Sequence, residues 1–226
     1  MQAPDTIRLA NVSIVIVGQN GQDYQPPLLT PEFLKSKKIV GKKWELAEQP
    51  ILTPVVSVLK YTNGIVLVME LNKIQVIDTK PEPSSLEIQS IATTFLSSLP
   101  YNRHIGVGVN VVAIRERPDA TGVIAQNFLK SGKWINSNLT SVAVRFAYAF
   151  DDVLLRIGFD KGRATLADGR EVDSILVDAN YHVDIPVTLS LEASTREAKK
   201  AIERFPLHLV DFEDRVKAYL GIEGED

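Results

Sequence analysis

The sequence lacks cysteine altogether and has only three histidines in 226 residues. A chain without cysteine forms no disulfide, has no thiolate nucleophile and builds no cysteine-based zinc site. This composition fits a cytoplasmic protein, because disulfide-rich chains belong to oxidising compartments. The lack of cysteine therefore excludes thiol-based chemistry and leads us to expect a reducing compartment.

Long apolar runs and a dominant charge are also absent. No apolar stretch approaches the ~18 residues of a membrane-spanning helix, and residues 1–18 have no basic segment ahead of their apolar part, as a signal peptide would. The net charge of −3 gives no general attraction to nucleic acid or anionic lipid. With 45% hydrophobic and 23% charged residues, the chain has the composition of a folded globular protein, and we expect no membrane partner.

Familiar catalytic motifs are missing as well. The sequence contains no G-x-S-x-G, P-loop or H-E-x-x-H pattern, and no serine–acid arrangement accompanies His104 or His208 in sequence. Catalytic triads assemble in space, so this absence disfavours an enzyme without eliminating one. We predict no catalytic residue and no cofactor.

What the chain does contain is a regular alternation of apolar and polar residues, rich in β-branched side chains, which predicts strands. These strands cover residues 6–18, 51–61, 65–70, 74–78, 104–114, 140–150, 153–159 and 172–187. Asn63–Gly64 and Asp151–Asp152 predict tight turns between neighbouring strands. Pro54 suggests an edge or a bulge within 51–61.

Capping patterns place the helices between and after these strands. We predict helices that begin near Thr30, Ser84, Asp119 and Ser194, the last divided at Pro206. Antiparallel hairpins with segregated helices indicate an α+β fold. We predict one unit over residues 1–226, made of two joined lobes at about 1–117 and 118–226, each an antiparallel meander covered by helices.

The segment "HIGVGVNVVAI" carries two glycines inside an apolar run. A dinucleotide-binding fingerprint needs a third glycine or alanine, and Val111 occupies that position. The alternation instead predicts a strand with His104, Gly106, Gly108 and Asn110 on one face. Glycine within a strand often marks a close approach. A packed helix is our favoured cause, and a ligand groove or a subunit contact is the alternative.

A second polar face occurs in "DANYHVD", where Asp178, Asn180, His182 and Asp184 share one side of a strand. Oxygen and imidazole groups at alternate positions can hold a divalent cation, with Asp178, His182 and Asp184 as ligands. This predicts, as an alternative function, an enzyme that depends on a small ligand or a metal. The simpler interpretation is the solvated face of a half-buried strand.

A third cluster is basic, and it consists of Lys35, Lys37, Lys38, Lys42 and Lys43, followed by Trp44. Lysines neutralise phosphates and an aromatic ring can stack on a base, so the cluster predicts a nucleic-acid contact as a second alternative. The acidic balance of the whole chain makes nucleic acid the less favoured partner.

Three segments together resemble an uncharacterised bacterial family: "IVIVG" followed by a loop and "TPEFL", "LPYNRHIGVGVN", and "VDIPV" ahead of a terminal helix. The element order is also similar to that of a sporadically distributed bacterial family with an I-G-type middle strand and a late D-I strand. The resemblance implies no activity and no functional residue. The leading hypothesis is a non-catalytic, cytoplasmic protein-interaction or assembly module whose partner is another protein or a second copy.

Overall fold

A computed structural model describes residues 7–19, 23–82, 87–99, 101–136, 138–165 and 169–222, and Ser84 of the predicted helix start lies outside them. The strands are β1 (Ile7–Gly18), β2 (Ile51–Leu52), β3 (Val56–Lys60), β4 (Ile65–Glu70), β5 (Lys73–Asp78), β6 (His104–Glu116), β7 (Ala143–Phe150), β8 (Val153–Thr165) and β9 (Glu171–Asp184). The α-helices are α1 (Pro31–Ser36), α2 (Ile88–Ser98), α3 (Ala120–Phe128), α4 (Leu191–Glu203) and α5 (Phe205–Leu220). Two short 3₁₀ helices are η1 (Pro26–Leu28) and η2 (Lys133–Asn136).

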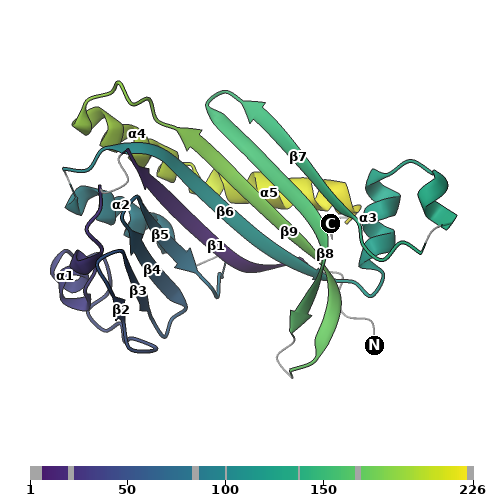
Figure 1. The fold of residues 1–226 in the computed structure, drawn as a ribbon, viewed down its shortest axis with the longest axis horizontal. Coiled ribbons are helices and arrows are strands. Elements are labelled where there is room, and N and C mark those ends of the chain that lie inside the picture. Colours follow the sequence, from purple (N-terminus) through teal and green to yellow (C-terminus); the bar gives the residue numbers. More distant parts are fainter. Residues whose placement is uncertain are drawn as a thin grey trace.

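The described strands form one nine-stranded antiparallel sheet in the order β2-β3-β4-β5-β1-β6-β9-β8-β7 (Figure 1). The α+β class and the antiparallel pairing are therefore confirmed. The two predicted lobes are not confirmed, because β6 of the first predicted lobe pairs with β9 of the second from Gly106 opposite Asp184 to Glu116 opposite Ser174. The predicted boundary near residue 117 follows the end of β6, and one sheet continues across it from β6 to β9.

The two halves of the sheet repeat one order of elements. A long strand, a short helix, a meander and a covering helix run from β1 to α2, and the same order runs from β6 to α4. Because β1 and β6 lie at the centre, β5 and β9, β4 and β8, and β3 and β7 take equivalent places on either side. The first half adds β2 at its edge, and the second half adds α5.

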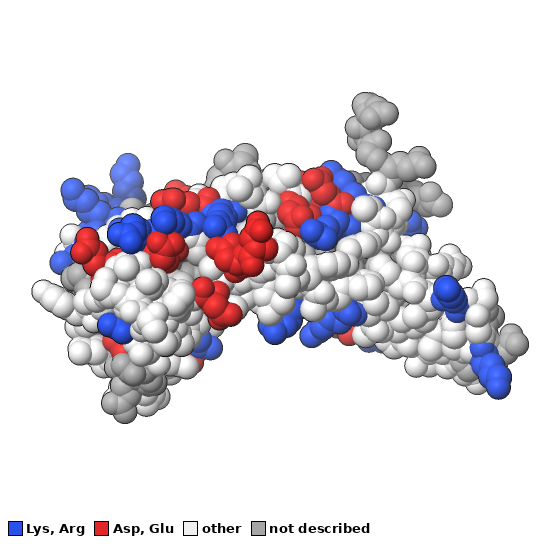
Figure 2. Space-filling model, turned by 90° about the horizontal axis from the view of Figure 1, so that it is seen from above, with Lys and Arg blue, Asp and Glu red and all other residues white. Residues whose placement is uncertain are grey.

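The core lies on one face of the sheet, beneath α2, α4 and α5. Val12, Ile14 and Ile16 of β1 are fully buried there, opposite Val109 and Val107 of β6. In Figure 1, α4 and α5 lie behind the strands. The other face, which we call the open face, has no helix packed over it in the described residues. Seen from above, the helix side forms the charged upper rim and the open face forms a hollowed lower rim (Figure 2).

Local chemistry explains where the elements begin and end. Thr30 accepts a hydrogen bond from the backbone of α1, and Asp119 does the same for α3, as predicted. Pro206 lies in the first turn of α5 and separates it from α4, also as predicted. The predicted start of α4 is wrong: Ser190 caps the helix, and Ser194 lies buried inside it.

The predicted strand 51–61 is divided into a hairpin. Thr53 closes a turn by accepting from Val56 N–H and donating to Val56 C=O, and β2 and β3 pair on either side of it. Pro54 provides the physical reason, because proline cannot donate to a strand ladder and favours turns. None of the described helices is both long and apolar enough to span a bilayer.

Candidate functional site

The two predicted polar strand faces lie side by side on the open face. β6 and β9 are neighbours in the sheet, and Asn110 stands directly opposite Asn180. Asn180 Nδ2 donates to Asn110 Oδ1 at 2.7 Å, and Asn110 Nδ2 donates to Ser13 Oγ of β1 at 3.2 Å. These bonds form a chain of polar side chains across three central strands. The sequence predicted both faces, but not that they meet.

The glycines of β6 leave room for side chains of β9, so the predicted helix contact is wrong. A Cβ atom at Gly106 would lie 3.1 Å from His182 Cε1, and one at Gly108 would lie 3.2 Å from Asn180 Nδ2. Both distances are shorter than ordinary van der Waals contact. The two glycines are buried, and the strip is covered from within the chain.

His104 does not lie on this strip. The register between β1 and β6 shifts by one residue between His104 and Gly106, and a β-bulge of this kind re-aims the neighbouring side chain. His104 is fully buried on the helix side, where its Nδ1 is 2.9 Å from the hydroxyl of Tyr24. Its backbone N–H donates to Ser194 Oγ of α4 at 3.5 Å. Burial lowers the pKa of the His104 imidazole to about 4.

The predicted metal ligands are only partly assembled. His182 Nε2 and Asp184 Oδ1 are 3.0 Å apart. Asp178 is directed elsewhere, because its Oδ1 accepts a hydrogen bond from Arg145 Nη2 of β7 at 3.4 Å. The described residues hold no group of three or more histidine, aspartate and glutamate side chains that could hold a metal ion. Of the three predicted metal ligands, His182 and Asp184 therefore lie together, and Asp178 does not join them.

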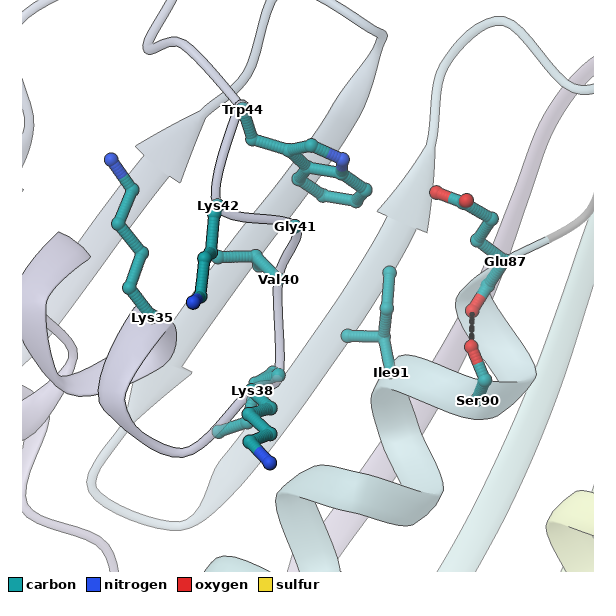
Figure 3. A pocket seen from close by; sticks show the side chains of 10 residues that line it. Lys35, Lys38, Val40, Gly41, Lys42, Trp44, Glu87, Ser90 and Ile91 are labelled. Atoms are coloured by element: carbon teal, nitrogen blue, oxygen red, sulfur yellow. Dashed lines mark hydrogen bonds between the residues drawn. The ribbon is translucent and has the colours of Figure 1, made fainter.

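The lysine cluster borders a pocket of about 360 Å³. Lys35, Lys38, Lys42 and Trp44 line it, whereas Lys37 and Lys43 do not. Figure 3 shows the three lysines on one wall, with Glu87, Ser90 and Ile91 from the start of α2 on the other. The sequence predicted the basic wall. It did not predict the α2 wall, which comes from a distant part of the chain.

β7 forms one end of the sheet, where it pairs with β8 on one side only (Figure 1). In the described part of the chain, no backbone hydrogen bond reaches its outer edge. The strand has eight residues, no proline and a single charged side chain, Arg145. Proline, lysine or a short strand usually protects such an edge. The sequence predicted this strand, but not its place at the border of the sheet.

The helix-side residues of β7 belong to a half-buried aromatic cluster. The ring of Phe146 stacks on Tyr219 of α5 with centroids 5.6 Å apart, and the hydroxyl groups of Tyr148 and Tyr219 share a hydrogen bond. The guanidinium carbon of Arg215 lies 5.0 Å from the centroid of the Tyr148 ring. Aromatic residues and arginine are enriched in protein–protein interfaces. The unpaired edge thus continues into side chains suited to a contact.

No family model matches this chain, and no curated protein matches its sequence. The resemblance to an uncharacterised bacterial family stays a prediction.

Proposed function

We propose that the protein is a cytoplasmic, non-catalytic assembly module that pairs with a second copy of itself through β7. The observation that carries this proposal is the outer edge of β7, which no backbone group of the described residues occupies. A row of unpaired N–H and C=O groups is a template for another strand. Pairing would satisfy these groups and continue the sheet.

The composition of β7 favours a second copy as the occupant. A twofold axis through the strand would pair β7 antiparallel with itself, which is an isologous contact. Phe146 and Tyr148 would then continue the aromatic layer across the junction. On the open face, Ala147 and Ala149 leave room for close approach. The one charge, Arg145, already has Asp178 as a partner, so the edge presents little charge that would repel its own copy.

Sedimentation velocity over a concentration series tests the proposal directly. We expect the wild type to form a dimer and Ala147→Lys to weaken dimerisation by at least about tenfold. If the twofold axis passes through Phe146, the new lysine faces Arg145 of the second copy. If the axis passes through residue 147, the lysine faces its own equivalent. Like charges oppose each other in both registers.

Ile51→Lys is the matched control, because it places the same charge at the opposite border of the sheet, where Ile51 is 49% exposed. It should leave the dimer unchanged. Hydrogen exchange adds a backbone readout: protection confined to residues 143–150 should rise with protein concentration. A wild type that stays monomeric at every concentration would overturn the proposal, and so would an equal effect of both lysine variants.

A further inference from the structure

The pocket beside the lysine cluster has a wall of solvent-exposed lysine side chains. In the described residues, Lys35, Lys38 and Lys42 form no ion pair, although many other lysines and arginines do. The indole Nε1 of Trp44 also donates no hydrogen bond there, whereas that of Trp134 donates to the Lys130 carbonyl. Lys35, Lys38 and Lys42 therefore make one wall of the pocket cationic, with the Lys35 ammonium pointing away from α2 and the indole nitrogen of Trp44 turned toward Glu87 (Figure 3). Ammonium groups without an acidic partner favour an anion.

The ring of Trp44 is held in place by its surroundings. Its centroid lies 5.2 Å from that of Tyr61 in an edge-on arrangement. On the pocket side it packs against Gly41, where a Cβ atom would come within 2.7 Å of Trp44 Cδ1. Glycine thus permits the indole to lie flat across the loop, with Ile91 facing it from α2 (Figure 3). The pocket offers a planar apolar surface beside its cationic groups.

Lys38 has a strained backbone conformation. Its φ of 57° lies in the left-handed region that favours glycine. A left-handed residue directly after the C-cap is a common end of an α-helix, so this conformation belongs to the end of α1. Lys38 follows α1, and the bond from Ile39 N–H to Leu34 C=O, at 2.9 Å, closes the turn around it. The backbone accepts this conformation while the side chain stands in the pocket wall.

We propose that this pocket binds a nucleoside polyphosphate, with the phosphates on Lys38 and Lys42 and the base against Trp44. A volume of about 360 Å³ suits a small molecule. An extended nucleic-acid strand needs a longer basic track, and Lys37 and Lys43 lie outside the pocket. Glu87 borders the far wall, opposite the lysines, and limits the anionic groups to one side.

Tryptophan fluorescence tests this site with ATP as the probe. The chain has two tryptophans, so Trp134→Phe leaves Trp44 as the only reporter. In this background we expect saturable quenching by ATP, and a loss of affinity of at least about tenfold in Lys38→Gln/Lys42→Gln. The matched control is Lys37→Gln/Lys43→Gln, which removes the same charge from the same loop outside the pocket. It should keep most of the affinity.

Two further probes separate the sources of binding. Inorganic tripolyphosphate carries the charge without the ring and should bind more weakly than ATP. An oligothymidylate that bound more tightly than ATP would identify a nucleic-acid strand as the occupant and overturn the mononucleotide. Equal losses in both lysine pairs, or no quenching by ATP in a variant whose thermal melt matches the wild type, would also overturn the site. None of these outcomes depends on dimerisation.

Discussion

The two halves of the sheet share one order of elements but end in different edges. The first half ends in β2, a strand of two residues placed between Pro50 and Pro54. The second half ends in β7, a strand of eight residues without proline. Proline and a short strand both prevent further pairing. The β2 border of the sheet is therefore protected against further strand pairing, and the β7 border is not.

This difference shows that the arrangement shared by the two halves does not determine where either half carries its candidate site. The first half carries its candidate site in the loop after α1, where the lysines stand. The second half carries its candidate site on the outer edge of β7. In both halves the core residues serve packing beneath the helices, and the candidate sites lie outside this core. The edge of β7 is free because, in the described residues, the second half has no counterpart of β2.

The largest expected effect concerns His104, which joins the two halves. It is fully buried between Tyr24 of the first half and Ser194 of the second. Burial lowers its pKa to about 4, so the unfolded chain binds a proton that the folded chain does not. Stability therefore falls as the pH drops from about 6.5 to 4, by about 3 kcal/mol. His104→Gln should flatten this slope in urea unfolding at several pH values.

His208→Gln shows how much of the acid-sensitive stability comes from α5 and how much from His104. Burial also lowers the pKa of His208, and the nearby Arg204 acts in the same direction. The two variants together should remove more of the slope than either alone. If wild type and His104→Gln lost stability in parallel between pH 7 and 4, the buried contact of His104 with Tyr24 and Ser194 would not be the acid-sensitive part of the fold.

The sequence predicted the alternation of the strands well, and it failed where a single residue changes the outcome. The bulge beside Gly106 turns His104 to the opposite face, and a two-residue period contains no signal for it. Ser194 has a capping spacing to Glu197, yet Ser190 caps the helix without a glutamate in that place. Each error concerns one residue, because the alternation fixes only the average orientation of a strand.

Long-range pairing was the other limit of sequence-based prediction. The β1–β6 pair merges the two meanders, and no local pattern marks it. The same reason applies to the candidate sites. Glu87 and Ile91 complete the pocket from a distant helix, and the border position of β7 follows from the order of the whole sheet. Local chemistry predicts which groups exist, whereas topology decides which groups meet.

The next effect concerns α5, which has no counterpart in the first half. Arg115 of β6 is almost fully buried, and its Nη1 donates to the carbonyl of Leu220 at the end of α5 at 3.2 Å. Arg115→Met keeps an apolar stem and leaves this carbonyl without that donor. We expect a loss of about 2 kcal/mol in the free energy of unfolding, measured with urea.

The control is Arg163→Met, since the Arg163 side chain is exposed and, among the described residues, its ion pairs are with the exposed Glu171 and the partly buried Asp173 of β9. Its expected cost is below about 0.5 kcal/mol. Similar midpoints for the two variants would mean that the second half holds α5 by its apolar face alone.

The smallest expected effect compares one strained residue from each half. Among the described residues, Lys38 and Asp151 are the non-glycine residues with positive φ, at 57° and 52°. Glycine removes the strain at both positions. Lys38→Gly should raise the free energy of unfolding by about 0.5–1 kcal/mol, and Asp151→Gly by less, because aspartate tolerates the left-handed region better than lysine does.

Ligand binding then separates the two positions. Lys38→Gly removes an ammonium group from the pocket, so ATP should quench Trp44 more weakly although the protein is more stable. Asp151→Gly, in the β7–β8 turn, should leave quenching unchanged. If Lys38→Gly gains stability and loses ATP binding, the strained backbone of Lys38 is retained because its side chain binds the ligand. If Asp151→Gly keeps ATP binding unchanged, the positive φ of Asp151 serves only the β7–β8 turn. Equal quenching in both variants would place Lys38 outside the binding site and leave its strain without a functional reason.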